Sequence, residues 1–118
     1  MEWKQLAFVA LGGGLGSALR AYLAHLLRGG FPWGTFLVNL TGCFLIGFLM
    51  RELDEERSGM RFFLITGFCG GFTTFSAFGS ETINLLRAGE LGAGLGNVAL
   101  TLLCCLAAVV IGHQLASG

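Results

Sequence analysis

The sequence predicts an all-α integral membrane protein with four transmembrane helices in one domain, residues 1–118. Of the 118 residues, 54% are hydrophobic and only 12% are charged, which is too little charge to cover a soluble domain. The apolar residues also fall into four runs of about 20 residues, the length that crosses a bilayer. Finally, 20 glycines accompany a single proline, a composition typical of packed membrane helices.

We expect the four spans at about residues 5–27, 31–50, 61–86 and 91–115. Short polar connections separate them, so both termini should lie on the same side of the membrane. The first run is interpreted as a retained helix and not as a signal peptide, because three more hydrophobic segments follow it. Strands of a membrane barrel are not expected, because the sequence lacks their period of two.

Pairs of glycines four residues apart predict close helix packing. They occur in the first, third and fourth spans, as Gly12/Gly16, Gly67/Gly71 and Gly92/Gly96. Small residues at this spacing let two helix backbones approach each other in lipid. The four cysteines contain no Cys-x-x-Cys pair and lie within apolar runs, so we expect them to pack between helices and to form neither disulfides nor a zinc site.

The charges exclude one class of partner and leave the membrane orientation open. Seven basic residues balance seven acidic ones, and no clustered basic face is available for nucleic acid. The basic residues that flank the spans are also nearly balanced between the two sides: Lys4, Arg51, Arg57 and Arg61 on one, Arg28 and Arg87, with Arg20 nearby, on the other. The positive-inside rule therefore allows insertion in both orientations, and two copies packed antiparallel, as well as a single fixed orientation.

The third span contains a segment that is unfavourable for a helix interior. Gly70-Gly71 and Thr73-Thr74 lie in its middle, and these residue types have low helix propensity. We expect a break near residues 70–74. A break would release carbonyl groups at one half-helix end and amide groups at the other, which together suit an ion site if they are buried in protein.

Polar side chains within the spans are the candidate functional residues, because polar groups in hydrocarbon are costly unless they are paired. Asn39 offers two donors and a carbonyl, either to an ion or to another helix. Phe75 and Phe78 share a helix face and can present positive ring edges to an anion, or simply pack. The other candidates are Ser76, Ser80 and Glu81 beyond the expected break, and Asn97, Thr101 and Cys105 on one face of the fourth span. Arg20 near the end of the first span can extend to the membrane interface or attract anions to an entrance.

Three segments together resemble the Fluc (CrcB) fluoride channels, and the resemblance extends over the whole chain. The segments are the glycine-rich start that leads to Arg20, the stretch Gly34-Thr35 to Gly42 around Asn39, and Gly67-Phe-Cys-Gly-Gly-Phe-Thr-Thr-Phe-Ser-Ala-Phe78. The third is long and unusual enough to be highly specific. The sequence departs from many members at Ala77, where a hydroxyl residue is common.

The resemblance implies a channel, not an enzyme, that passively releases cytoplasmic fluoride across the plasma membrane (the inner membrane of a Gram-negative cell). It implies an antiparallel, dual-topology homodimer with two fluoride pathways. Residues matching Asn39, Phe75 and Phe78 line each pathway, and the residue matching Ser76 belongs to a polar track that reaches Glu81. The resemblance also implies a sodium ion at the dimer centre, held by the backbone carbonyls of Gly70 and Thr73 from each subunit.

Two other functions are compatible with a small four-helix membrane protein. A small multidrug exporter would need an acidic residue in the first span, and the only acid within a span is Glu81, near the end of the third. An intramembrane thiol enzyme would use Cys104, Cys105 and His113, but no base lies within a helical turn of the cysteines.

Overall fold

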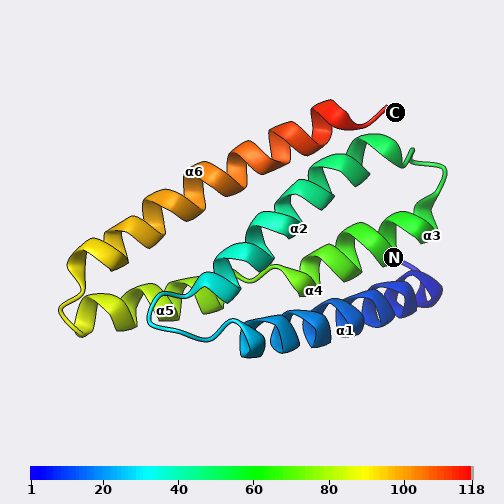
Figure 1. The fold of residues 1–118 in the computed structure, drawn as a ribbon. Coiled ribbons are helices and arrows are strands. Elements are labelled where there is room, and N and C mark those ends of the chain that lie inside the picture. Colours follow the sequence, from blue (N-terminus) through cyan, green and yellow to red (C-terminus); the bar gives the residue numbers. More distant parts are fainter. Residues whose placement is uncertain (118) are drawn as a thin grey trace.

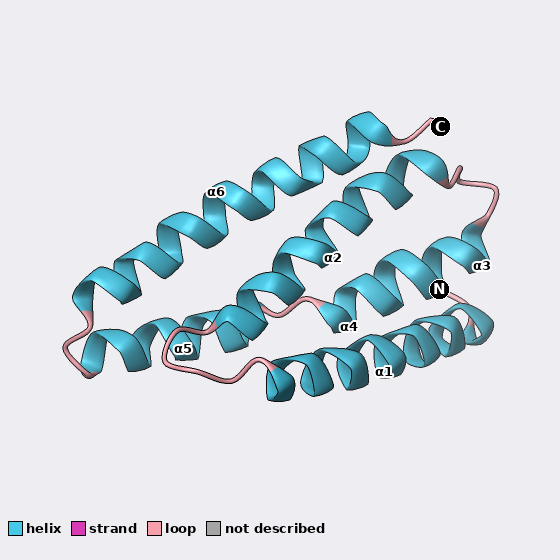
Figure 2. Cartoon of the chain, in the orientation of Figure 1, coloured by secondary structure: helices cyan, strands magenta, loops and turns pink. Residues whose placement is uncertain are grey.

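The computed structural model describes residues 1–117 and consists of helices joined by short connections (Figures 1 and 2). The first two membrane-length helices are α1 (Trp3–Leu26) and α2 (Trp33–Glu52), and the last is α6 (Leu91–Leu115). The third segment, Ser58–Arg87, combines α3 (Ser58–Arg61), the π-helix η1 (Phe62–Cys69), α4 (Gly70–Phe72) and α5 (Phe75–Arg87). All four segments are long and apolar enough to cross a membrane, and residues 1–117 contain no strand, which confirms the predicted all-α membrane class.

The four segments run alternately up and down, with both ends of the chain at the same end of the bundle (Figure 1). The molecule measures 49 × 29 × 23 Å, so its long axis exceeds the roughly 30 Å hydrocarbon thickness of a bilayer. The charged connection between α2 and α3 lies at the end that holds the termini. The turns α1–α2 and α5–α6 lie at the opposite end.

Local sequence signals explain where the helices begin and end. Glu2 and Gln5 form a capping box at the start of α1, with the Glu2 N–H donating to Gln5 Oε1 at 2.9 Å. At the C-terminal end of α2, the Arg61 guanidinium donates to the free carbonyls of Met50 and Leu53. The turn between α5 and α6 contains Gly89 with φ +83°, a conformation that glycine adopts without steric cost.

Glycines form the closest helix contacts. A Cβ atom on Gly12 or Gly16 of α1 would collide with the backbone carbonyls of Phe63 and Phe68, and one on Gly71 would collide with the Gly13 carbonyl. Gly47 of α2 and Gly112 of α6 face Val109 and Phe44 carbonyls in the same way. The predicted role is therefore confirmed for the pairs in the first and third segments. It is wrong for Gly92 and Gly96 within this chain, where an added Cβ meets nothing within 4 Å.

The third segment changes its packing partner along its length. Its first half, η1 and α4, packs against α1, whereas α5 packs against α6. The change occurs where Thr73 and Thr74 have extended backbone dihedrals (φ −86°, ψ 155° and φ −150°, ψ 117°) between α4 and α5. Helix α2 passes beside the connection between α4 and α5 (Figure 1) and packs closely on α6, and the candidate site is located here.

Candidate functional site

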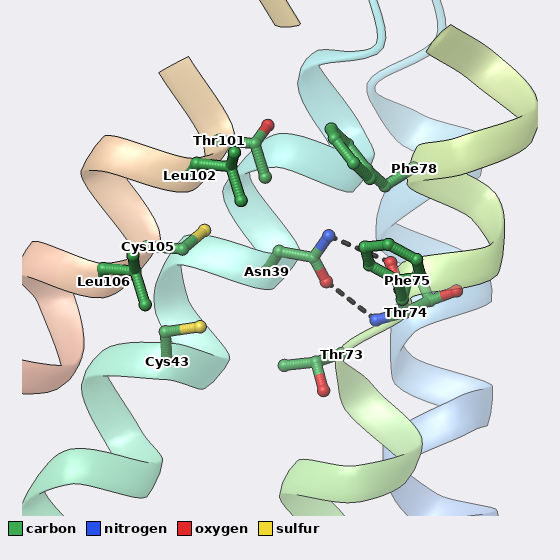
Figure 3. A pocket seen from close by; sticks show the side chains of 10 residues that line it. All are labelled: Asn39, Cys43, Thr73, Thr74, Phe75, Phe78, Thr101, Leu102, Cys105 and Leu106. Carbon is green, nitrogen blue, oxygen red and sulfur yellow. Dashed lines mark hydrogen bonds between the residues drawn. The ribbon is translucent and has the colours of Figure 1, made fainter. Parts of the chain in front are cut away.

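A cavity of about 220 Å³ lies beside the extended residues, between α2, α5 and α6 (Figure 3). All ten residues that line it are uncharged: Asn39, Cys43, Thr73, Thr74, Phe75, Phe78, Thr101, Leu102, Cys105 and Leu106. Four of the residues predicted for a fluoride pathway, Asn39, Phe75, Phe78 and Thr101, therefore meet in one place. The cavity combines an apolar wall with a few neutral hydrogen-bonding groups.

The Asn39 side chain is buried and bonds to the backbone of Thr74 through both of its polar atoms (Figure 3). Its Nδ2 donates to the Thr74 carbonyl at 3.1 Å, and its Oδ1 accepts from the Thr74 N–H at 2.7 Å. This pairing determines which way the amide points. An amide nitrogen carries two protons and the Thr74 carbonyl takes one of them. Asn39 thus ties α2 to the third segment and keeps one N–H for another acceptor.

Thr74 is the structural centre of the connection between α4 and α5. Its Oγ1 accepts from the Ala77 N–H at 3.1 Å and so caps the N-terminus of α5. In an uninterrupted α-helix, the N–H groups of Thr74 and Ala77 would donate to the carbonyls of Gly70 and Thr73. Because both N–H groups bond elsewhere, these two carbonyls are released from α-helical bonding.

The two phenylalanines occupy different environments although they are neighbours on α5. Phe78 is 8% exposed and packs within the chain, whereas Phe75 is 80% exposed. Their ring centroids lie 5.6 Å apart with the planes tilted by 44°, so their positive edges do not face the same direction. Phe78 therefore forms the wall of the cavity on the α5 side, and Phe75 lies at the open side of the cavity.

The fourth-segment residues expected on one face are all buried: Asn97, Thr101 and Cys105. Thr101 and Cys105 line the cavity, together with Leu102 and Leu106 of the same helix. Asn97 lies one turn away and bonds to Thr82 of α5, with Nδ2 donating to Oγ1 at 2.9 Å. The spacing of four residues thus identified a real face of α6.

Three of the residues predicted for the fluoride pathway lie outside this cavity. Ser76 is exposed and its Oγ is 3.2 Å from Thr74 Oγ1. Glu81 lines a separate hollow next to Gly29, Gly30 and Pro32, where its carboxylate accepts from Thr35 Oγ1 at 2.6 Å. Arg20 donates from Nε to the Gly71 carbonyl at 3.1 Å.

The Gly71 contact ties Arg20 and Ser17 of α1 to the end of α4. Ser17 Oγ donates to the same carbonyl at 3.3 Å. In a continuous helix this carbonyl would accept from the Phe75 N–H, so α1 supplies the donors that the extended residues remove. A role of Arg20 in attracting anions stays a prediction.

Sequence reasoning did not identify Thr74 and Cys43, which line the cavity, or Thr35, which bonds to Glu81 outside it. Thr74 precedes a helix and carries a side-chain oxygen, so the N-cap preference for threonine was an available signal. Cys43 follows Asn39 by one helical turn, which places it on the same face. Nothing in the sequence pairs Thr35 with Glu81, 46 residues away.

The chain matches known proteins over most of its length. Residues 7–113 match the family model described as CrcB-like protein, Camphor Resistance (CrcB). The "Fluoride-specific ion channel FluC" of Methylocella silvestris is 42% identical, with 92% of this chain and 90% of the relative covered. Relatives with the same description from Opitutus terrae and Clostridium perfringens are each 45% identical, covering 94% and 92% of this chain and 91% and 90% of their own lengths. The chain therefore belongs to the CrcB family.

Proposed function

We propose that this chain is one subunit of a fluoride-selective ion channel that lets fluoride leave the cytoplasm passively and so lowers its toxicity. The observation that carries the proposal is the uncharged cavity at Asn39, Phe78 and Thr101. The relatives described as fluoride-specific ion channels supply the identity of the ion. The family consists of ion channels and not of enzymes, which sets aside the thiol chemistry considered for Cys104 and Cys105.

The chemistry of the cavity suits a small anion that must bind and leave. Fluoride holds its water tightly, so a narrow path must replace that water with donors. A fixed positive charge would hold the ion too firmly, and conduction requires binding weak enough for release. The second Asn39 N–H and the ring edges of Phe75 and Phe78 are neutral donors of this kind.

We extend the path from the cavity along α5. Ser76 adjoins the cavity through Thr74, and Glu81, held by Thr35, lies one and a half turns further along the helix. These residues form the proposed polar track. Arg20, on the neighbouring α1, is partly exposed and adds a positive charge that raises the local anion concentration.

We propose that two copies assemble as an antiparallel homodimer in the plasma membrane, or the inner membrane of a Gram-negative cell. Two observations support this. Phe75 stands 80% exposed beside the cavity, so a partner is needed to cover the path. The flanking basic residues are nearly balanced between the two ends of the bundle, which permits both orientations.

We also propose that the third segment acts as a broken helix that binds sodium at the dimer centre. The residues fit such a site. The Gly70 and Thr73 carbonyls are released from α-helical bonding, and Gly70 is exposed on the surface of the single chain. Carbonyl oxygens suit a hard cation, and residues 1–117 offer no cluster of three His, Cys, Asp or Glu side chains as an alternative. An ion that binds only to the assembled dimer stabilises that dimer, so the sodium ion would have a structural role.

Fluoride efflux from liposomes tests the proposed function. The purified protein is reconstituted with potassium fluoride trapped inside, or potassium chloride in the matched liposomes, and release is followed with an electrode selective for the trapped anion after a potassium ionophore is added. We expect rapid electrogenic fluoride release, and no release from matched liposomes that contain chloride. Equal release of both anions, or of neither, would reject the proposal.

A further inference from the structure

Three buried side chains next to the cavity form a continuous chain of hydrogen bonds between α5 and α6. Thr82 Oγ1 donates to the Phe78 carbonyl at 2.7 Å, and Asn97 Nδ2 donates to Thr82 Oγ1 at 2.9 Å. Thr101 Oγ1 then donates to Asn97 Oδ1 at 3.3 Å. Asn97 is only 2% exposed, so its amide cannot form hydrogen bonds to solvent instead.

The direction of each bond in this chain is forced by the one before it. The Phe78 carbonyl can only accept, so it takes the single proton of Thr82. Thr82 Oγ1 can then only accept from Asn97, which turns the amide nitrogen of Asn97 toward α5. The amide oxygen of Asn97 therefore faces Thr101, and because this oxygen can only accept, Thr101 must be the donor.

This direction decides what Thr101 offers to the cavity. Thr101 lines the cavity with Asn39 and Phe78, and its one proton is committed to Asn97. In this arrangement Thr101 has no proton left to offer to an anion in the cavity. When Thr101 turns its proton toward an anion, the buried Asn97 oxygen loses its partner, and a buried unpaired acceptor is costly. At 3.3 Å, the Thr101–Asn97 bond is the longest of the three.

We propose that Asn97 is a positioning residue that weakens anion binding at Thr101 by competing for its hydroxyl proton. The inference rests on the proposed fluoride-channel function and refines it. With Asn97 in place, the Thr101 hydroxyl donates to the cavity only while an anion is present. When the anion leaves, the hydroxyl returns to its bond with Asn97. Thr82 keeps Asn97 in this orientation, since without it the amide is free to turn over.

Replacing Asn97 tests the proposal through the half-saturating concentration, which is the fluoride concentration that gives half-maximal current. Asn97→Leu removes the competing acceptor at similar volume and leaves the Thr82–Phe78 bond in place. In planar bilayers, the fluoride concentration that gives half-maximal current should fall about fivefold, the value of one ordinary hydrogen bond. In a Thr101→Val background, Asn97→Leu should leave the half-saturating concentration unchanged. A residue that only supports the fold would change the maximal current instead, with or without Thr101.

Thr82 provides a second variant in case Asn97→Leu does not assemble. Thr82→Val removes the acceptor that orients Asn97, so the amide can turn its nitrogen to Thr101 and release the Thr101 proton to the cavity. Thr82→Val should also lower the half-saturating fluoride concentration, and Thr82→Ser, which keeps the hydroxyl, should keep the parent's value. If the parent conducts fluoride but Asn97→Leu and Thr82→Val keep its half-saturation, the inference is wrong and the proposed function stands. A parent that does not conduct fluoride overturns both.

Discussion

Asn39 combines two tasks in a single side chain: it holds the backbone of Thr74 and it keeps one N–H for the cavity. An aspartate of the same size would set a carboxylate oxygen against the Thr74 carbonyl and place negative charge beside the path. We expect Asn39→Asp to lower fluoride flux about tenfold to hundredfold, because opposed buried acceptors cost about 1–3 kcal/mol and ~1.4 kcal/mol is tenfold in a rate.

Liposome efflux measures the effect of Asn39→Asp, and Gln114→Glu is the matched control. Gln114 is an exposed amide near the end of α6, outside the cavity, so the same exchange should leave flux unchanged. Parent-like flux in Asn39→Asp would show that Asn39 only packs.

Arg20 donates a hydrogen bond to the Gly71 carbonyl. We therefore expect Arg20 to stabilise the end of α4 as well as to attract anions through its charge. Arg20→Met should lower fluoride flux about tenfold or more, in line with about 1.5–3 kcal/mol for a hydrogen bond from a charged group. Arg20→Lys keeps the charge and should lower flux less than Asn39→Asp does.

Ionic strength separates the two actions of Arg20. An effect that arises from charge alone is screened at high salt, whereas a lost hydrogen bond to Gly71 is not. We expect the deficit of Arg20→Met to persist when sodium gluconate is raised on both sides. Its disappearance at high salt would mean that Arg20 acts only by attracting anions.

At the scale of elements, the glycine contacts set how closely the helices approach. Gly16→Ala places a Cβ against the Phe68 carbonyl of η1, and overpacking of this kind costs about 1–3 kcal/mol. The variant should unfold in detergent at a lower temperature than the parent, as followed by tryptophan fluorescence. Gly92→Ala, where the new methyl group meets nothing within 4 Å, should not. Equal unfolding temperatures for the two variants would contradict the packing described above.

The sequence allowed the four spans to be predicted, because hydropathy over about 20 residues depends only on the local chain. The packing partners of each half of the third segment were not predictable in this way. The η1–α4 half packs on α1 and α5 packs on α6, yet both halves are apolar and carry small residues. The π-helix η1 was also missed, since its bonding pattern leaves no simple mark in the sequence.

The candidate site was predictable where residues share a helix and not where they pair across helices. Phe75 with Phe78, and Thr101 with Cys105, follow from helical spacing. The Asn39–Thr74 pairing joins residues 35 positions apart, and Arg20 reaches Gly71 across 51. No periodicity encodes such contacts, so Asn39 appeared as a candidate whose partner was unknown.

For the whole molecule, the proposed dual topology makes a quantitative prediction. Single cysteines introduced at Glu55 and at Ala88 lie in connections at opposite ends of the bundle and are exposed, while the native cysteines lie within the helices. In intact cells, a membrane-impermeant maleimide should label about half of the Glu55→Cys chains and half of the Ala88→Cys chains, because the two orientations are equally populated. Full labelling at one site and none at the other would mean one fixed orientation.

As proposed above, this chain forms a passive pathway that distinguishes fluoride from chloride. The reversal potential tests it most directly, because it reports selectivity and passive conduction in one measurement. With the protein in a planar bilayer, potassium fluoride and potassium chloride are set in opposing gradients and potassium is equal on both sides. We expect the current to reverse at the equilibrium potential of fluoride. Reversal at the chloride potential, or no current attributable to the protein, would contradict it.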